Sequence, residues 1–323
     1  MLHATYAQPM PSTSNLEMNT TMKPLFHLSD GSLFSQRYTV SHRLGQGCFG
    51  SVYAGTRNHD SFPVAIKVIE QYSGKMDPFN SSLPLEVSLL HRVSHIQGVI
   101  KLLDACWMGT TLIIVMERIE SCMDLAQLME KQAMTPELMQ SCFRQLVETM
   151  IECHAAGVVH RDIKLENILV DLSSNAIKLI DFGCGDYYTE YYETPSGTPA
   201  YKPPEAFFTY KCNSIASEVW SLGILLYVMV TGRYLFETVP ELEKVLSEGF
   251  TIPQEVPMHC QDLMRHLLRF DWNERPSLEQ VLSHPFMIHP LHTSNSQLFQ
   301  SYPTVSHMSP CHPLFNHCMV PCQ

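Results

Sequence analysis

Two short motifs in the middle of the chain combine residue types that can handle a phosphoryl group. The run from His160 to Asn167 reads His-Arg-Asp-Ile-Lys-Leu-Glu-Asn, and an Asp-Phe-Gly tripeptide begins at Asp181, fourteen residues after Asn167. Asp162 can orient or accept the proton of an attacking hydroxyl group, while Asn167 and Asp181 offer the oxygen ligands that magnesium prefers. The alternative is a buried His-Arg-Asp network with a chance Asp-Phe-Gly nearby. Each tripeptide alone is weakly specific, but this order and spacing predict phosphoryl transfer.

A glycine-rich stretch precedes these motifs. Gly45, Gly47, Gly50 and Val52 form the pattern G-x-G-x-x-G-x-V. A dinucleotide-binding fold shares the glycines but opens a helix at the third one. The residues after Gly50 read Ser-Val-Tyr-Ala-Gly-Thr, which is typical of a strand. We therefore interpret the stretch as a hairpin whose backbone amides cover nucleotide phosphates, with a plain glycine turn as the alternative.

A single lysine ends the apolar run Val-Ala-Ile-Lys. This residue, Lys67, would be costly to bury without an anion. The α- and β-phosphates of ATP are one candidate, and the carboxylate of Glu86, which precedes the apolar face of the next predicted helix, is another. A lysine that reaches solvent from a surface strand is the alternative. The otherwise apolar strand favours the buried pair.

Strand-like runs fill the first part of the patterned region, and helical periodicity dominates the rest. Strands are predicted at 38–44, 51–57, 64–70, 99–105, 111–117, 168–171 and 176–180. Helices are predicted at 83–93, from 125, at 136–155 after a Thr135 N-cap, and at 214–230, 241–249, 261–270 and 277–283. The pattern predicts an α+β fold with two lobes: a small antiparallel sheet with one main helix, and a larger, mainly helical lobe.

The two ends of the chain lack apolar periodicity and are predicted to be flexible tails, at residues 1–37 and 291–323. Between them lies one domain, residues 38–290, with a first lobe at 38–116, a hinge at 117–122 and a second lobe at 123–290. The C-terminal tail has cysteines and histidines that match no standard zinc site, so disorder is the prediction there. They are Cys311, His312, His317, Cys318 and Cys322.

Composition excludes several classes of protein. The 323 residues are 45% hydrophobic and 16% charged, which are globular values, and the net charge of −11 argues against nucleic acid or anionic membrane as the main partner. Eleven cysteines without a C-x-x-C pair, and no visible signal peptide, predict a cytoplasmic or nuclear setting. The apolar run 224–230 is too short to span a bilayer. We expect a monomer.

Together the motifs resemble those of the eukaryotic protein kinase family over residues 38–290. Pro-Pro-Glu ends at Glu205, Val-Trp-Ser-Leu-Gly occupies 219–223, and Arg275 is the arginine that the resemblance pairs with Glu205. Glu-Arg at 117–118, Ile-Lys after Asp162, and His-Pro at 284–285 are similar to the PIM subfamily of serine/threonine kinases. Lys164 favours serine or threonine as the acceptor, because tyrosine kinases generally lack a lysine there.

The resemblance implies an ATP- and magnesium-dependent kinase that phosphorylates proteins at Ser or Thr near basic residues, without prior phosphorylation of its activation loop. It implies that the catalytic residues are Asp162, Lys164, Lys67, Glu86 and Thr198, and that the metal ligands are Asn167 and Asp181. It places ATP on Leu44, Gly45, Gly47, Gly50, Val52, Ala65, Lys67, Met116, Glu117, Ile119 and Leu169. The apolar members of that set fit a plain protein core equally well. Asp124 and Glu166 carry the negative charge for a substrate arginine.

Four positions depart from the pattern of the subfamily or of kinases generally. Ile119 stands where PIM kinases have proline, which restores an N–H donor in the hinge. Leu165 and Arg233 stand at positions that are usually acidic, so the preference for basic sites is expected to be weaker. Glu218 stands where most kinases have an aspartate that braces the catalytic loop; PIM members also lack that aspartate.

A segment rich in hydroxyl groups follows the Asp-Phe-Gly tripeptide, at residues 186–201. Phosphorylation there could order the loop by giving Arg161 a partner, but a solvated surface loop is the favoured interpretation.

Three function classes compete: an active Ser/Thr kinase, a pseudokinase or scaffold, and a dinucleotide-binding oxidoreductase. The residues needed for catalysis are all present, and the oxidoreductase leaves Asp162 and Asp181 unexplained. The active kinase is the leading hypothesis.

Overall fold

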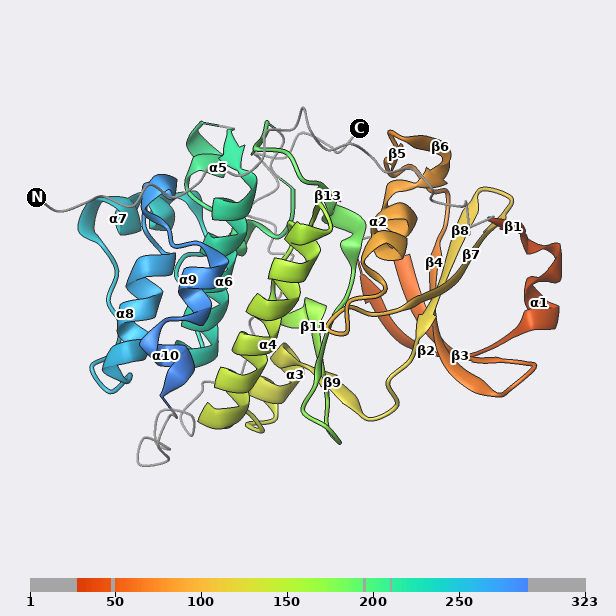
Figure 1. Ribbon diagram of the computed structural model, residues 1–323, viewed down its shortest axis with the longest axis horizontal. Coiled ribbons are helices and arrows are strands. Elements are labelled where there is room, and N and C mark those ends of the chain that lie inside the picture. Colours follow the sequence, from red (N-terminus) through yellow and green to blue (C-terminus); the bar gives the residue numbers. More distant parts are fainter. Residues whose placement is uncertain (1–27, 48–49, 194–195, 210, 290–323) are drawn as a thin grey trace, which may run out of the picture.

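The chain folds into two lobes that lie at opposite ends of the ribbon diagram (Figure 1). The computed structural model describes residues 28–47, 50–193, 196–209 and 211–289. A β-sheet with one principal helix makes up the first lobe, and helices dominate the second. The predicted α+β, two-lobed fold is therefore confirmed. Residues 1–27 and 291–323 of the predicted tails, including the tail cysteines and histidines, lie outside the described residues.

The sheet of the first lobe has six strands in the order β1-β7-β8-β4-β3-β2. Their bounds are β1 Ser29–Asp30, β2 Tyr38–Gly47, β3 Gly50–Arg57, β4 Phe62–Ile69, β7 Leu102–Met108 and β8 Thr111–Glu117. All pairs are antiparallel except β1 with β7. Lys67 is paired with Val52 on β3 and with Ile114 on β8, so the register places the lysine in the middle of the sheet, beside the glycine-rich turn.

The ordered domain begins earlier than the sequence predicts. Residues 28–37, assigned above to the flexible tail, form β1, a 3-10 turn η2 (Gly31–Leu33) and the short helix α1 (Phe34–Arg37). Phe34 is buried with Tyr38 in a small second core on the sheet, and Arg37 forms an ion pair with Asp104 of β7. One aromatic and one arginine in a polar segment give no periodic signal, so only the long-range contacts reveal this order.

A hairpin that the sequence analysis did not predict leads into the principal helix of the first lobe. Strands β5 (Met76–Asp77) and β6 (Asn80–Pro84) pair with each other and continue directly into α2 (Leu85–Val93). The face of α2 packs against β7 and against the 3-10 turn η4 (Phe182–Cys184), which contains most of the Asp-Phe-Gly motif. Helix α2 thus links the sheet to the catalytic motifs.

Helices form the second lobe around one buried helix. Their bounds are α3 Leu125–Glu130, α4 Pro136–Ala155, α5 Glu205–Phe208, α6 Ser214–Thr231, α7 Val239–Glu248, α8 Met258–Leu267, α9 Leu278–Leu282 and α10 Pro285–Ile288. Thr135 caps α4 as predicted, because its hydroxyl accepts a hydrogen bond from the Leu138 amide. Helix α8 begins three residues before its predicted start at 261, immediately after Pro257.

The central helix α6 is apolar on nearly all sides. By length and composition it is the one helix of the described residues that could cross a membrane, but 67% of the relevant window is buried inside the fold. Trp220, Leu222 and Leu226 are completely buried. Such burial is what the core helix of a globular lobe shows.

Short strands lie where the two lobes meet. A three-stranded sheet has the order β12-β11-β9, from Ile177–Leu179, Ile168–Asp171 and Cys122–Asp124. Two further pairs are β10 (Val158–Val159) with β13 (Asp186–Tyr187), and β14 (Tyr191–Tyr192) with β15 (Cys212–Asn213). The catalytic loop, residues 160–167, follows β10 and ends in the 3-10 turn η3 (Leu165–Asn167). The loop is therefore held between paired strands.

Candidate active site

Three charged side chains meet at the junction of the lobes. The Lys67 ammonium nitrogen lies 2.6 Å from Glu86 Oε1 and 2.8 Å from Asp181 Oδ1. Lys67 comes from β4, Glu86 from α2, and Asp181 directly precedes η4, so the contact joins the sheet, the helix and the second lobe. Lys67 and Glu86 are both buried, which rules out the alternative of a surface lysine.

The electrostatics of this trio favour its charged form. Burial alone lowers the pKa of Lys67, but Glu86 and Asp181 outweigh it and raise the pKa well above its usual value. For Asp181 burial acts against ionisation, yet Lys67 and the Gly183 amide hold the pKa below its ordinary value. Burial raises the pKa of Glu86, but its 2.6 Å contact with a protonated lysine favours the ionised pair.

The Asp-Phe-Gly motif is turned inward by its backbone. Asp181 has a left-handed conformation with φ of 63°, and its side chain accepts a hydrogen bond from the Gly183 amide. Phe182 is buried with its ring edge-on to His160, at 4.7 Å between ring centroids. His160 bonds to the Ile180 carbonyl through Nε2 and to the Asp162 amide through Nδ1. The motif and the catalytic loop therefore hold each other in place.

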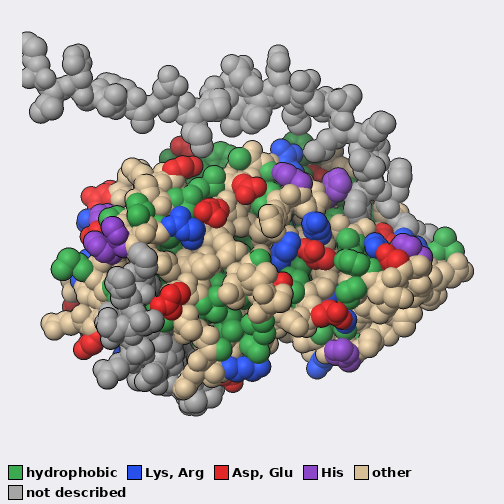
Figure 2. All heavy atoms as spheres, turned by 60° about the horizontal axis from the view of Figure 1, so that its bottom comes forward, with side chains coloured by type: hydrophobic (Ala, Val, Ile, Leu, Met, Phe, Trp, Pro, Cys, Tyr) green, Lys and Arg blue, Asp and Glu red, His purple; other side chains and the backbone are tan. Residues whose placement is uncertain are grey.

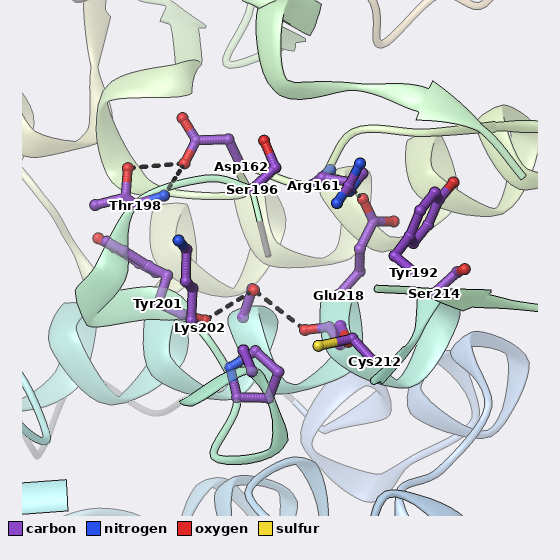
Figure 3. Close-up of a pocket in the computed structure, with 14 residues that line it drawn as sticks. Arg161, Asp162, Tyr192, Ser196, Thr198, Tyr201, Lys202, Cys212, Ser214 and Glu218 are labelled. Atoms are coloured by element: carbon purple, nitrogen blue, oxygen red, sulfur yellow. Dashed lines mark hydrogen bonds between the residues drawn. The ribbon is translucent and has the colours of Figure 1, made fainter. Parts of the chain in front are cut away.

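The residues expected to act on the substrate hydroxyl form one hydrogen-bonded group, of which Figure 3 shows Asp162 and Thr198. Asp162 Oδ1 accepts from both the backbone amide and the hydroxyl of Thr198, each at 2.7 Å. Lys164 Nζ lies 2.9 Å from Asp162 Oδ2 and 2.9 Å from Thr198 Oγ1. Burial opposes the charge on Lys164, but Asp162 raises its pKa above the ordinary value. The predicted contact of Thr198 with Asp162 and Lys164 is present.

Asn167 completes this group and leaves an oxygen free. Its amide nitrogen donates to the Asp162 backbone carbonyl at 2.8 Å and to Asp162 Oδ2 at 3.1 Å. Both donor hydrogens are thereby used, and within the part of the chain that the structure describes Oδ1 accepts no hydrogen bond. Asp181 similarly uses Oδ1 for Lys67 and Gly183 and keeps Oδ2. One amide oxygen and one carboxylate oxygen are the kind of ligands that a hard divalent cation prefers, so the donor set of Asn167 and Asp181 fits such an ion.

The carboxylate of Glu218, on α6, clamps the catalytic loop by binding two of its backbone amides. Glu218 Oε1 accepts hydrogen bonds from the His160 and Arg161 amides, both at 2.7 Å, and Oε2 lies 2.5 Å from His154 Nε2. Burial disfavours the charge, but the His154 bond and the Arg161 amide lower the Glu218 pKa below its usual value. The sequence analysis placed Glu218 at the bracing position. It missed His154, one histidine near the end of an amphipathic helix, which carries no local signal.

The glycines of the glycine-rich stretch lie on two paired strands: Gly45 and Gly47 are at the end of β2, and Gly50 begins β3 opposite Gly47. Gly50 has φ of 139°, and a Cβ atom there would lie 2.3 Å from the Val68 carbonyl oxygen, so only glycine fits. Gly45 and Gly47 are exposed, with open space where a Cβ would stand. Val52 is half-buried opposite Lys67. The third glycine, Gly50, therefore begins a strand and not a helix, which removes the dinucleotide-binding alternative.

The residues predicted to hold adenine come from five strands: Leu44 from β2, Val52 from β3, Ala65 from β4, Met116 from β8 and Leu169 from β11. Ala65 on β4 is directly opposite Met116 on β8, and Leu169 on β11 is opposite Asp124 on β9. Met116 is buried, Ala65 and Leu169 are half-buried, and Leu44 is 49% exposed. This increase in exposure from Met116 to Leu44 is what an adenine site with Met116 inside and Leu44 at its edge would show.

The hinge residues differ in what they can offer a nucleotide. The Glu117 carboxylate binds Lys178 Nζ at 2.9 Å and the Lys101 amide at 3.0 Å, so any contact of Glu117 with adenine has to use its backbone. The carbonyl of Ile119 accepts from the Cys122 thiol at 3.2 Å. Among the described residues the Ile119 amide has no acceptor. It is available as the additional hinge donor that its sequence position predicts.

The two acids expected to bind a substrate arginine lie close to each other but are not equivalent. Asp124 caps α3, with Oδ1 accepting from the Gln127 amide at 2.7 Å. Glu166 lies on η3, and its Oε2 is buried without a hydrogen-bond partner among the described residues. Burial raises the pKa of both carboxyl groups. Glu166 thus carries a buried acceptor that a cationic ligand could satisfy.

A bidentate ion pair anchors the segment after Thr198, as the sequence analysis expected. Arg275 Nη1 and Nη2 donate to the two carboxylate oxygens of Glu205 at 2.7 and 2.8 Å. Both residues are buried, and the guanidinium also lies 5.0 Å from the ring centroid of Trp220. The predicted pairing of Arg275 with Glu205 is confirmed.

Charged side chains are also spread over the outer surface. On the face in Figure 2, acidic and basic side chains of the described residues are interspersed rather than gathered into one extended patch. A cavity of about 40 Å³ lies beside Asp162 (Figure 3). Arg161, Tyr192, Ser196 and Glu218 are among its lining residues.

Comparison with known proteins identifies the family of this chain. Residues 38–287 fit the model of the protein kinase domain family, so the chain belongs to that family.

Within the family, the chain is similar to serine/threonine kinases of PIM type. It is 37% identical to serine/threonine-protein kinase pim-2 of Danio rerio over 275 residues, which are 79% of this chain and 86% of that protein. It is 36% identical to serine/threonine-protein kinase prk-2 of Caenorhabditis elegans, over 79% of this chain and 59% of the nematode protein. The probable kinase MARK-A of Dictyostelium discoideum is 31% identical over 77% of this chain and 24% of its own length. The predicted PIM-like family is confirmed.

Proposed function

We propose that this protein is an active serine/threonine kinase that transfers the γ-phosphoryl group of ATP, as its magnesium complex, to proteins. One observation carries the proposal: Lys67, Glu86 and Asp181 are already in contact while Asp162, Lys164 and Thr198 form one bonded group. In the kinase mechanism the lysine–glutamate pair and the aspartate of Asp-Phe-Gly must both be in place for transfer. No rearrangement is needed to bring them together.

The residue roles follow from positions and chemistry. Lys67 would hold the α- and β-phosphates, while Asn167 and Asp181 would hold magnesium, which neutralises charge on the phosphates. Asp162 would orient the acceptor hydroxyl, and Lys164 would stabilise negative charge that develops during transfer. Thr198 fixes Asp162 through two hydrogen bonds and so positions the base.

An assay of phosphate incorporation tests the proposal. Purified protein with magnesium and ATP should phosphorylate a serine peptide with nearby arginines, whereas Asp162→Asn and Lys67→Met should lose at least about a hundredfold in kcat/KM. Glu70, an exposed residue directly after β4, provides the matched control, since Glu70→Gln changes a charge outside the site. Equal incorporation by wild type and both site variants would show that a contaminating kinase produces the signal.

A pseudokinase that only binds ATP is the second candidate. It predicts nucleotide-dependent thermal stabilisation of the wild type with no transfer to any peptide. The Asp162 variant separates the two functions: in an active kinase it keeps nucleotide binding and loses transfer. In a pseudokinase the variant and the wild type behave alike in both assays.

We also propose a preference for basic substrates, weakened relative to PIM kinases. The buried and unpaired Glu166 Oε2 supports it, because a substrate guanidinium would supply the missing hydrogen-bond donor. Arg233 lies at the edge of a hollow of about 450 Å³ lined by Tyr227, Tyr234 and Thr251, and its positive charge would repel a second arginine. Glu166 thus favours basic substrates, whereas Arg233 disfavours substrates with a second arginine.

A positional peptide library separates these contributions. Glu166→Gln should lower the preference for arginine by about tenfold at one position, the value of a charged hydrogen bond. Arg233→Asp should raise selectivity for peptides with several arginines. An unchanged profile for Arg233→Asp would remove that residue from the substrate surface.

A cytoplasmic or nuclear monomer remains part of the proposal. The described cysteines are free thiols, which supports a reducing setting. Fractionation of cells and the elution volume of the purified protein test location and oligomeric state.

A further inference from the structure

An aromatic pair extends the substrate side of the active site away from Asp162. Tyr201 lines the cavity beside Asp162, and Figure 3 shows its side chain on the side where Thr198 meets Asp162. The ring of Tyr201 lies edge-on to the ring of Tyr234, with 5.7 Å between the ring centroids. Tyr234 belongs to the segment that follows α6. An extended peptide advances about 3.3 Å per residue, so a substrate held at Asp162 reaches Tyr234 within a few residues.

Tyr234 connects two groups of opposite charge. Burial and the nearby carboxylate of Glu166 raise the pKa of the Tyr234 hydroxyl to about 12, so the hydroxyl keeps its proton. The preceding residue, Arg233, is exposed, and both residues line the hollow of about 450 Å³. Glu166 has a buried acceptor without a partner among the described residues, and Arg233 brings N–H donors to the hollow. Negative and positive charge therefore lie on either side of one tyrosine.

The guanidinium of Arg233 has no anion of its own in the part of the chain that the structure describes. Its only hydrogen bonds there are made by its backbone, to the hydroxyl of Thr231. Glu237 and Glu255, the acids that flank the hollow in the sequence, are exposed and form no ion pair with it. The other described residues that line the hollow are neutral. The hollow thus presents one unpaired positive charge.

The end of α6 fixes the position of Arg233. Gly232 ends the helix in a left-handed conformation with φ of 68°, and its amide donates to the Val228 carbonyl at 2.8 Å. The Arg233 amide donates to Thr231 Oγ1 at 3.3 Å, and this hydroxyl donates to the Tyr227 carbonyl at 2.8 Å. Burial raises the pKa of Tyr227, whereas the charge of Arg233 acts in the opposite direction, as expected for a cation near that hydroxyl.

From these observations we propose that Arg233 and the hollow beside it bind an anionic side chain of the protein substrate, either a carboxylate or a phosphate group. A guanidinium presents a planar fork of N–H donors that fits both anions. The proposal rests on the proposed kinase function and names a further part of its substrates. With Glu166 as the site for an arginine, the kinase selects segments that carry both an arginine and an acid. The alternative is that Arg233 only complements the C-terminal end of α6.

A peptide scan by turnover tests this proposal. The parent peptide has one serine, one arginine at the position that the wild type prefers, and alanine elsewhere. Aspartate, phosphoserine or a second arginine then replaces each alanine in turn. At one position we expect aspartate, phosphoserine or both to raise kcat/KM about tenfold over alanine, mostly through KM, the contribution of a charged hydrogen bond. A second arginine at that position should lower kcat/KM. A gain with phosphoserine alone would identify the anion as a phosphate group.

Charge reversal gives the decisive comparison. Arg233→Glu should exchange the preference at that one position, so that arginine is favoured over the anion, and Arg233→Ala should abolish both preferences. The matched control is Arg265→Ala, since this exposed arginine of α8 donates to Gln261 and does not line the hollow. It should keep the wild-type profile. Absence of an acid preference at every position, or a preference that survives Arg233→Ala, would overturn the proposal.

Binding without turnover separates the anion site from the kinase function. The same peptides, with alanine in place of serine and a fluorescent label, are titrated with each variant and followed by anisotropy. In the wild type the acidic peptide should bind about tenfold more tightly than the alanine peptide, and added salt should weaken this gain because Arg233 is exposed. If such binding occurs without any phosphate transfer, the kinase proposal fails and the anion site stands. Equal Kd values for acidic and alanine peptides, with a lower urea midpoint for Arg233→Ala, would instead establish the helix-end alternative.

Discussion

The clamp that Glu218 makes on the catalytic loop leads to a sharp prediction about stability. Its carboxylate accepts two backbone N–H groups at 2.7 Å and lies 2.5 Å from His154 Nε2, all in a buried position. Leaving a buried donor unsatisfied costs about 1–3 kcal/mol, so Glu218→Ala, which removes the acceptor of two amides, should lower the free energy of unfolding by about 2–6 kcal/mol. That is a large part of the total for a domain, which is about 5–15 kcal/mol.

Glu218→Gln is the more informative change, because the amide oxygen can still accept from His160 and Arg161. We expect it to lose only the charge, about 1–2 kcal/mol in urea unfolding. Glu218→Asp is shorter by one methylene and should not reach both amides and His154, so its kcat should fall more than that of the glutamine variant. The measurements are urea midpoints and single-turnover rates on the same preparations.

The pH dependence follows from the lowered pKa of Glu218. A carboxyl group whose pKa is depressed in the folded state contributes stability that is fully present above its unfolded pKa, near 4.5, and lost as pH falls through the folded value. The stability gap between wild type and Glu218→Gln should therefore be largest at neutral pH and shrink below about pH 4.5. A gap that is absent at pH 7, or that does not shrink in acid, would contradict the clamp.

Three further predictions concern single contacts. Arg275→Ala should cost about 3–5 kcal/mol in chemical denaturation because it leaves the buried Glu205 carboxylate unpaired; a loss below 1 kcal/mol would mean that water replaces the pair. Ile119→Pro removes a hinge N–H and should raise the KM for ATP about two- to tenfold with little change in kcat, and an unchanged KM would show that ATP does not use this donor. Gly50→Ala should weaken nucleotide binding in a thermal-shift titration, since its Cβ would meet the Val68 carbonyl at 2.3 Å. Gly45→Ala is the control, because a Cβ there has open space and the variant should bind nucleotide as the wild type does. Equal losses of nucleotide affinity in the two variants would exclude the steric reason.

Local patterns predicted much of the candidate site. Lys67 and Glu86 were paired from an apolar strand and the start of the following helix, and they lie in contact. Spacing alone identified Asp162, Asn167 and Asp181, because a loop and a nearby turn can bring such residues to one point. These inferences worked since each depends on residues close together in the sequence, or on motifs whose order is fixed.

Other parts of the site had no local signal. The β5–β6 hairpin and the order of residues 28–37 depend on contacts such as Tyr187 with Asp77 and Phe34 with the sheet. The link from His154 to Glu218 spans 64 residues. No periodicity marks a histidine or a tyrosine whose partner lies on another element, so the sequence analysis could not find them.

The amino-acid sequence by itself determined the chemistry of this protein: which acids, amide and lysine are available, and that a glycine turn and an apolar strand present them. Tertiary structure decided how these groups are held, because the positions of Glu218, Tyr234 and the hairpin depend on the packing of distant elements. Hydrogen-bonding capacity and side-chain charge are properties of single residues, whereas burial and pairing arise only when separate segments exclude water together.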